Sequence, residues 1–483
     1  MLFNSYIFIL CFLPLCLMGY FALNHFKKYQ LAQAYLLGMS LWFYGYFNVR
    51  YLLIIISSVL INFILYRGIE KFRGQKACKG LMIAGVLINL GILGYFKYMD
   101  FFLSNVNALF KTQFNLLHIV LPLGISFFTF QQISFIVDAY RGEIPGYNLL
   151  YYASFVTFFP QLIAGPIVTH DELVPQFMDE EKKKLNYDNL AKGFYIFTLG
   201  LAKKRLLADT FSDVVTYGFT TLNNLSSVSA LLVMLSYTIQ LYFDFSGYCD
   251  MAIGIGKMFN IDLPINFNSP YKALTITEFW DRWHMTLTRF FTKYVYIPLG
   301  GNRKGKVRTY VNIMIVFLAS GLWHGASWNF VFWGAMHGVF VVITRLFKKF
   351  FDSLHPALNW FVTFTFVNVA WVFFRAETFT QATTLLRKLV SWSFSLDPTF
   401  IEMFRLKELR KLLSFAHVET YYPQFLITAF FLVAFALIFS RKNAYERMQT
   451  FKPGFVNLCT TMILLVWSVF SFSGVTVFLY FNF

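Results

Sequence analysis

The sequence predicts an all-α polytopic membrane protein, and three observations support this prediction. Of the 483 residues, 57% are hydrophobic and 21% aromatic, whereas 13% are charged, about half the charged share of ordinary soluble domains. Long stretches carry no charge at all, among them 80–96, 311–323 and 424–440. A helix of about 20 apolar residues spans a bilayer, and the chain offers roughly ten to thirteen spanning or re-entrant segments, some of them short or broken.

The organisation of the chain favours one large bundle over several modules. No repeat with a period of about 20–50 residues is visible, so we expect a single transmembrane domain over residues 1–483. Two polar insertions interrupt it, at about 169–193 and 376–423. Both hold amphipathic stretches, which we expect to lie at the membrane surface. The first apolar segment lacks a basic start and a small-residue cleavage site, so we expect an uncleaved first helix.

The stretch 118–168 does not have the pattern of a simple span. It contains Pro122, Pro160, Gly165 and Pro166 among apolar residues, and proline interrupts a helix by removing a donor and clashing with the preceding turn. Inside lipid, such breaks persist only where protein or a watery cavity satisfies the freed backbone groups. We therefore expect this stretch to pack in the protein interior or to re-enter the membrane.

The formal net charge of +17 arises from 41 Lys and Arg against 24 Asp and Glu. In a soluble domain such a charge would suggest nucleic acid. Here the basic residues concentrate between hydrophobic spans, at 67–79, 303–308 and 441–447, which is the pattern of cytoplasmic loops. We therefore expect these loops in the cytoplasm, the bilayer as a partner and no nucleic-acid partner.

Several kinds of chemistry have no support in the sequence. The five cysteines form no CxxC pair, so neither a zinc site nor a disulfide framework is predicted. The motifs GxxxxGK[ST], HExxH and GxSxG are absent, which leaves nucleotide hydrolysis, zinc proteolysis and a serine-hydrolase elbow unsupported. The loop GGNRKG at 300–305 offers basic groups for donor phosphates, although a turn that sets membrane topology is the simpler interpretation.

The first two of three polar islands leave alternatives open. In DFSGYCDMAIG, Asp244 and Asp250 follow an apolar run and lie either in a loop outside the span or inside the membrane, where ionisable groups are functional candidates. If FWDRWHMTLTRFF is one helix, Asp281, His284 and Thr288 share a face. His284 is then either a base oriented by Asp281 or a paired group on an interfacial helix whose arginines reach lipid phosphates.

The third island, GLWHGASWN, places His324 inside the bilayer region. From Arg308, expected in the cytoplasm, 16 residues lead to His324, which is roughly 24 Å of helix. Because 309–344 as one helix would measure about 54 Å, far more than the hydrocarbon thickness of about 30 Å, a bend is needed. Gly321, Gly325 and Ser327 offer the place for it. A neutral imidazole there can act as a general base, although an interhelical hydrogen bond remains the alternative.

The motif WDRWHMTLTRFFTKYVYIPLGGNRKG followed by GLWHGASWNFVFWGAMHG resembles the signature region of the membrane-bound O-acyltransferase (MBOAT) family. DFSGYCDMAIG, INFNSPY and FFPQLIAGPI resemble the bacterial branch typified by the alginate O-acetyltransferase membrane subunit. The resemblance covers most of the chain. It implies a helical bundle with a central tunnel or funnel in the bacterial inner membrane, crossed by an acyl group that leaves a cytoplasmic thioester donor.

This resemblance also implies roles for particular residues and partners. His324 matches the signature histidine and His284 a second histidine of D-alanyl-transferring relatives, so both are expected to be catalytic. The resemblance implies acetyl-CoA or another acyl thioester as donor, no permanently bound cofactor or metal, and an extracytoplasmic SGNH-type acetyltransferase that modifies the polysaccharide. His337 fits an ordinary interior histidine better. Residues expected to line the substrate path are Asp281, Asp244, Ser327, Asn329 and Trp323.

Two alternatives to polysaccharide O-acetylation remain at this point. The first is D-alanyl transfer to teichoic acids, catalysed by related proteins of the same family. The second, of another class, is a transporter or flippase, since the broken helices of 122–166 would suit a substrate path. Against a transporter, the sequence shows neither two-half symmetry nor a distributed set of charges for coupling ions.

Overall fold

The computed structural model of the chain describes residues 1–404, 424–472 and 478–479. Over these residues the chain consists of helices joined by turns and loops, and its only β-type pairing is an isolated bridge between Phe267 and Trp283. The predicted all-α class is confirmed.

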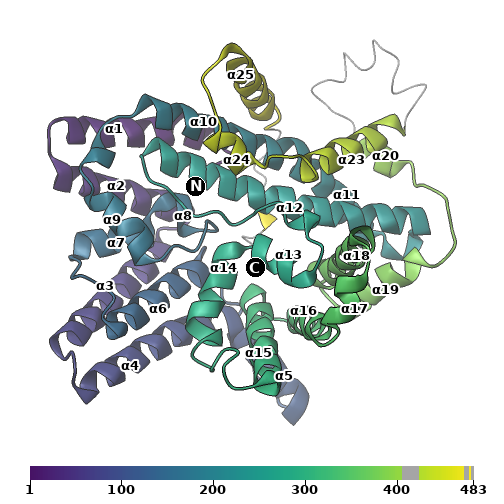
Figure 1. The fold of residues 1–483 in the computed structure, drawn as a ribbon, viewed down its shortest axis with the longest axis horizontal. Helices are drawn as coiled ribbons and strands as arrows, with labels where there is room; N and C mark the ends of the chain where they lie inside the picture. Colours follow the sequence, from purple (N-terminus) through teal and green to yellow (C-terminus); the bar gives the residue numbers. More distant parts are fainter. Residues whose placement is uncertain (405–423, 473–477, 480–483) are drawn as a thin grey trace. The chain divides into compact units, whose positions relative to one another are not determined.

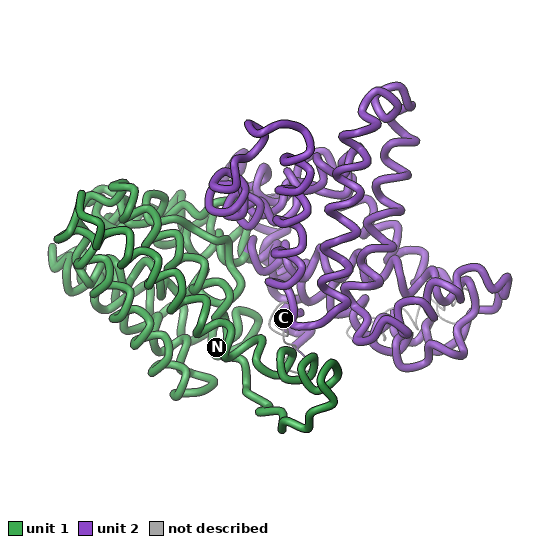
Figure 2. The backbone as a smooth tube through the Cα atoms, turned by 90° about the horizontal axis from the view of Figure 1, so that it is seen from below, with its two compact units in different colours: residues 1–197, 251–265, 480–483 green, residues 198–250, 266–479 purple. Residues whose placement is uncertain are grey.

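The chain divides into two compact units, which Figure 2 draws in different colours. Among the described residues, unit 1 comprises 1–197 and 251–265, and unit 2 comprises 198–250 with the described residues from 266 to 479. Two helices, α10 (Tyr187–Ala202) and α12 (Ser227–Met258), contribute residues to both units.

Unit 1 holds the helices of the first part of the chain, from purple to blue in Figure 1. Buried amides join three of them: the Asn62 amide donates to the Asn89 oxygen at 3.1 Å, and the Ser58 hydroxyl donates to Gln132 at 3.0 Å. Such polar contacts hold helices together where lipid supplies no hydrophobic drive. Besides the first residues of α10 and the end of α12, its elements are η1 (Phe8–Phe12), α1 (Leu13–His25), α2 (Tyr29–Gly45), α3 (Arg50–Lys71), α4 (Lys76–Leu93), η2 (Gly94–Tyr98), α5 (Met99–Phe110), α6 (Ile125–Arg141), α7 (Leu149–Thr157), α8 (Phe159–Leu162), α9 (His170–Met178) and η3 (Glu181–Lys183).

Unit 2 holds the remaining helices and all three polar islands of the sequence. Its elements, besides the end of α10 and most of α12, are η4 (Lys203–Ala208), α11 (Asp209–Thr220), η5 (Leu222–Asn224), η6 (Pro270–Lys272), α13 (Ile276–Arg282), α14 (Met285–Phe291), η7 (Thr292–Tyr296), α15 (Lys306–His324), α16 (Trp328–Leu346), α17 (Lys348–Ser353), α18 (Pro356–Arg375), α19 (Phe379–Leu389), α20 (Thr399–Met403), α23 (Phe425–Ile438), α24 (Ala444–Gln449) and α25 (Phe455–Phe470).

Within the described part of the chain, six helical stretches are long and apolar enough to cross a membrane, so the chain is a multi-pass membrane protein. Two shorter apolar helices, α23 and α25, add to them. Several other expected spans differ from a simple crossing because their helices are short, interrupted or charged at one end, as α15 is by Lys306 and Arg308. The six stretches are Phe8–His25, Arg50–Lys71, Lys76–Phe110, Ser227–Met258, Trp328–Leu346 and Pro356–Arg375.

The prediction that the stretch 118–168 packs in the interior holds for two parts of it, whereas most of 118–120 and most of the loop between α6 and α7 are exposed. Nearly all of α6 is buried, and residues 152–168 are buried throughout. The helix breaks between α7 and α8, where Phe158 takes a non-helical conformation and Pro160 occupies the first turn of α8. Such an interrupted, buried backbone is the arrangement that membrane proteins tolerate away from lipid.

The two polar insertions carry the amphipathic helices expected of them. In the first, Thr169 and Glu172 form a capping box at the start of α9, which buries Leu173, Val174 and Phe177. In the second, α19 buries Ala382 and Leu385 and exposes its polar face. The basic stretch FRLKELRKLL lies outside the described residues beyond Phe404.

Candidate active site

A break between α13 and α14 positions His284. The two helices do not join into the single helix that the spacing predicted, because α13 ends at Arg282 and His284 adopts the left-handed conformation, with φ 48°. That conformation costs a non-glycine residue roughly 1–2 kcal/mol. The segment around Asn266 stabilises it: the Asn268 amide donates to the Arg282 carbonyl at 2.9 Å, and the Met285 amide donates to the Asn266 carbonyl at 3.0 Å.

The side chain of Asn266 completes this turn. Its Oδ1 accepts hydrogen bonds from the Thr286 amide at 3.2 Å and from the Thr286 hydroxyl at 2.7 Å. These bonds satisfy a donor in the first turn of α14, where backbone amides have no intrahelical partner. The motif INFNSPY therefore acts structurally, by holding the backbone of His284 from outside its own helix.

The break turns His284 into the interior, where aromatic rings surround it. Its side chain is fully buried, and its ring lies 4.8 Å from that of Phe245 and 5.8 Å from that of Trp323, between centroids. Burial lowers the pKa of the His284 imidazole well below its ordinary value, because water no longer stabilises the charged form. The imidazole is therefore neutral at pH 7.

His324 ends α15, at a bend that leads into α16. The backbone is extended at Gly325 and at Ser327, and α16 begins at Trp328. The bend predicted for this region is confirmed. Two glycines let the helices cross closely, because a Cβ at Gly321 would overlap the Phe330 carbonyl oxygen and lie 3.3 Å from the Cα of Gly334.

The structure brings His324 and His284 together. His324 is 2% exposed, and the centroids of the two imidazoles lie 6.2 Å apart. Three further rings enclose His324, those of Trp323 at 4.9 Å, Trp333 at 5.1 Å and Phe374 at 5.2 Å. Two histidines that are 40 residues apart in the sequence thus share one aromatic enclosure.

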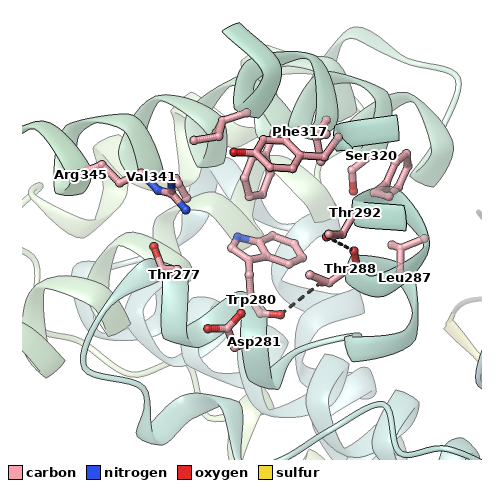
Figure 3. Close-up of a pocket in the computed structure, with 14 residues that line it drawn as sticks. Thr277, Trp280, Asp281, Leu287, Thr288, Thr292, Phe317, Ser320, Val341 and Arg345 are labelled. Carbon is pink, nitrogen blue, oxygen red and sulfur yellow. Dashed lines mark hydrogen bonds between the residues drawn. The ribbon is translucent and has the colours of Figure 1, made fainter. Parts of the chain in front are cut away.

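A pocket of about 280 Å³ lies beside α13, α14, α15 and α16 (Figure 3). Asp281 and Arg345 are exposed where they line it, whereas Trp280 and Ser320 are buried parts of its wall. Ser320 precedes His324 by one turn, so both side chains lie on one face of α15. The pocket therefore runs along α15 toward the histidine pair.

The expected alignment of Asp281 with His284 is wrong, because it assumed a continuous helix. Asp281 is exposed at the pocket, whereas His284 is fully buried beyond the break. Burial and the neighbouring Glu278 carboxylate both raise the pKa of Asp281. Asp281 therefore lines the pocket, as expected of a residue on the substrate path, but it does not orient His284.

Asp244 and Asp250 lie inside α12, so the alternative of an outer loop is wrong for both. Lys204 Nζ lies 2.6 Å from Asp244 Oδ1, and Lys203 Nζ lies 2.6 Å from Asp250 Oδ2. Asp209 completes the cluster, with an oxygen 2.9 Å from Lys204 Nζ. Asp244 is therefore a paired buried charge and does not line the pocket.

The remaining expected lining residues have distinct positions. Trp323 packs against both histidines. Asn329 is buried and donates from Nδ2 to the Ala376 carbonyl at 2.7 Å, which ties the start of α16 to the end of α18. Ser327 precedes α16 in extended conformation. Trp323 is thus the residue that contacts the histidine pair.

Two features of the site escaped the sequence analysis: the buried cations Lys204 and Arg205 of KKR at 203–205, and Trp280, which lines the pocket. The interpretation of His337 as an ordinary interior histidine is confirmed, because its side chain is fully buried and accepts a hydrogen bond from Trp280. A basic triplet flanked by apolar residues and followed by an aspartate is the one signal that could have indicated buried ion pairs.

These features define a polytopic membrane protein with a histidine pair enclosed beside a pocket. The chain belongs to the membrane-bound O-acyltransferase family, MBOAT, whose family model matches residues 138–383. The chain is thus an O-acyltransferase, as its motifs implied, and the transporter alternative is set aside.

Similarity to individual proteins supports the bacterial polysaccharide branch. The chain is 44% identical over 420 residues to a peptidoglycan O-acetyltransferase of Helicobacter pylori, covering 81% of this chain and 80% of the relative. It is 40% identical over 400 residues to a probable alginate O-acetylase, AlgI, of Pseudomonas aeruginosa, covering 81% and 75%. It is 27% identical over 276 residues to a teichoic acid D-alanyltransferase of Bacillus subtilis, covering 53% of this chain and 69% of the relative.

Proposed function

We propose that this chain moves an acetyl group from a cytoplasmic thioester donor, such as acetyl-CoA, across the bacterial inner membrane. The acetyl group passes toward an extracytoplasmic SGNH-type partner that acetylates an exopolysaccharide or a cell-wall glycan. The observation that carries this proposal is the enclosed pair of His284 and His324 next to a pocket that ends one turn short of His324.

The charge pattern supports entry of the donor from the cytoplasm. The pocket is lined by Arg345, near the end of α16, and by Ile313, about two turns into α15. Both helix ends adjoin basic segments, 303–308 before α15 and 345–349 at the end of α16. Basic segments next to spans lie on the cytoplasmic side, so this end of the pocket faces the compartment that holds acyl thioesters.

The chemistry assigned to His324 is general-base catalysis. Its neutral imidazole accepts the proton of the acceptor hydroxyl while the hydroxyl oxygen attacks the thioester carbonyl carbon. The carbon–sulfur bond then breaks, the thiolate leaves and takes up a proton, and an oxygen ester forms. His284 supplies a second imidazole beside the same reacting atoms, and the surrounding rings exclude water that would hydrolyse the thioester.

D-alanyl transfer to teichoic acids is the second candidate. Its support is the weaker similarity to the Bacillus subtilis D-alanyltransferase, whereas the acetylating relatives match more of the chain at higher identity. Competition between labelled acetyl-CoA and a D-alanyl carrier-protein thioester in the same preparation distinguishes the two donors.

The test uses purified protein in proteoliposomes with radiolabelled acetyl-CoA on the side of the basic loops. Wild-type protein is expected to cleave the thioester and to pass label to an added acceptor. His324→Ala is expected to lose about 100-fold or more in rate, since a positioned base contributes roughly 10²–10⁴-fold. His25→Ala, an exposed histidine at the end of α1, is the matched control. A folded His324→Ala protein with wild-type turnover would contradict the assignment.

A further inference from the structure

Trp280 forms a wall between the pocket and the aromatic enclosure of His324. It is buried on α13 and lines the pocket, where Figure 3 shows its indole ring between Asp281 and Phe317. The indole packs at 5.3 Å from the Phe317 ring and at 5.8 Å from the Trp333 ring, between centroids. Since Trp333 also lies 5.1 Å from His324, the Trp333 ring contacts both Trp280 and the histidine.

His337, on α16, holds this indole in place. Its Nδ1 accepts a hydrogen bond from the Trp280 indole Nε1 at 3.2 Å, and its side chain is fully buried on α16. An indole nitrogen can only donate, so Nδ1 of His337 carries no proton. The imidazole is therefore the neutral tautomer with its proton on Nε2. The rings of Trp333 at 4.9 Å and Phe366 at 5.1 Å pack against it.

This hydrogen bond is the polar anchor of an otherwise apolar wall. The Trp280 indole also packs against the rings of Phe279, Phe317, Trp333 and His337. Ring packing alone permits sliding and rotation more readily than a directional bond does. Without the acceptor, a buried indole N–H is left unpaired, so the ring is expected to turn toward polar groups at the pocket rim, such as Asp281.

We propose that His337 is a positioning residue for the acyl donor: it fixes Trp280 as the inner wall of the pocket and so sets the path of the thioester to His324. This inference rests on the proposed function, because it requires the donor in this pocket. His337 touches no reacting atom. Its effect therefore falls mainly on donor binding and KM, and less on kcat.

Three variants separate positioning from general packing. His337→Leu removes the acceptor and keeps an apolar side chain, whereas His337→Asn retains an acceptor oxygen near the position of Nδ1. Trp280→Phe keeps a ring and removes the indole donor. The matched control is Trp360→Phe, since the Trp360 indole donates to the Tyr271 carbonyl at 2.9 Å and Trp360 does not line the pocket.

The measurement is equilibrium binding of S-acetonyl-CoA, a thioether analogue that cannot transfer its acyl group, together with KM and kcat for acetyl-CoA. His337→Leu and Trp280→Phe are each expected to weaken binding roughly 3–10-fold, the worth of one hydrogen bond. Their double variant is expected to be no weaker than either alone, and His337→Asn is expected to stay within about two-fold of wild type. If His337→Leu does not fold, the comparison of Trp280→Phe with Trp360→Phe carries the test.

Distinct results overturn the inference and the proposed function. The positioning role is overturned by any of three results: wild-type binding and KM in His337→Leu, additive losses in the double variant, or an equal loss in Trp360→Phe. None of these results contradicts acetyl-CoA as the proposed donor. If wild-type protein neither binds the analogue nor cleaves acetyl-CoA, the proposed donor is wrong and the inference falls with it.

Discussion

Replacing Gly334 with alanine would push apart the two helices that carry the site. A Cβ at Gly334 would overlap the carbonyl oxygen of Phe317 on α15 and lie 3.3 Å from the Cα of Gly321. Both obstructing atoms belong to the backbone of α15, so no side-chain rotation relieves the overlap. The helices must separate, and His324 lies at the end of the helix that moves.

The magnitude follows from the size of this overlap. A carbon and an oxygen that are not bonded rest at about 3.3–3.6 Å, so the helices have to separate by about 1 Å. Overpacking of this kind costs roughly 1–3 kcal/mol of stability. A displacement of about 1 Å at reacting groups lowers the rate by roughly 100-fold. We therefore expect Gly334→Ala to lose activity roughly 100-fold while the folded state loses about 1–3 kcal/mol of stability.

A graded series makes the prediction sharp. In Gly338→Ala the new Cβ would lie 2.8 Å from the Met314 sulfur, and a flexible methionine can move aside, so a loss of a few-fold is expected. Gly91→Ala on α4 meets nothing within 4 Å and serves as the matched control. Thermal unfolding and thioester cleavage are measured for all three in the same detergent. Equal activity of Gly334→Ala and Gly91→Ala would refute the reasoning.

Two further substitutions test how the site is supported. Lys204→Met leaves Asp244 buried beside Asp209 without its closest cation. The folded state is therefore expected to lose about 3–5 kcal/mol of stability, measured as a lower melting temperature. The double variant Lys204→Met with Asp244→Asn is expected to recover part of this stability, and no recovery would argue against a paired charge. Asn266→Ala removes the two bonds to Thr286 and releases the turn at His284. It is expected to cost about 1–2 kcal/mol of stability and to lower acetyl transfer more than Asn48→Ala does, at a partly exposed asparagine of unit 1. Equal transfer by the two variants would show that the turn at His284 needs no such support.

The sequence predicted the part of the site that depends on local chain geometry. The distance from Arg308 to His324, the glycines and the need for a bend are properties of one segment, and the structure places the bend at Gly325–Ser327. The same local reasoning was wrong at His284. Helical periodicity aligned it with Asp281, but pairing with the segment around Asn266 breaks the helix between them. The catalytic roles of both histidines and the single domain over 1–483 stay predictions.

Composition and motifs alone therefore determined that this chain is a helical membrane protein of the O-acyltransferase family with His324 in an apolar setting. Only the tertiary structure decided that His284 joins His324 in one enclosure, that Lys204 neutralises Asp244 inside α12, and that Trp280 bonds to a histidine 57 residues away. The physical reason is that periodicity and hydropathy report the preferences of neighbouring residues, whereas these contacts join segments that approach only when helices pack. A buried charge or imidazole has no recognisable partner until that packing brings one.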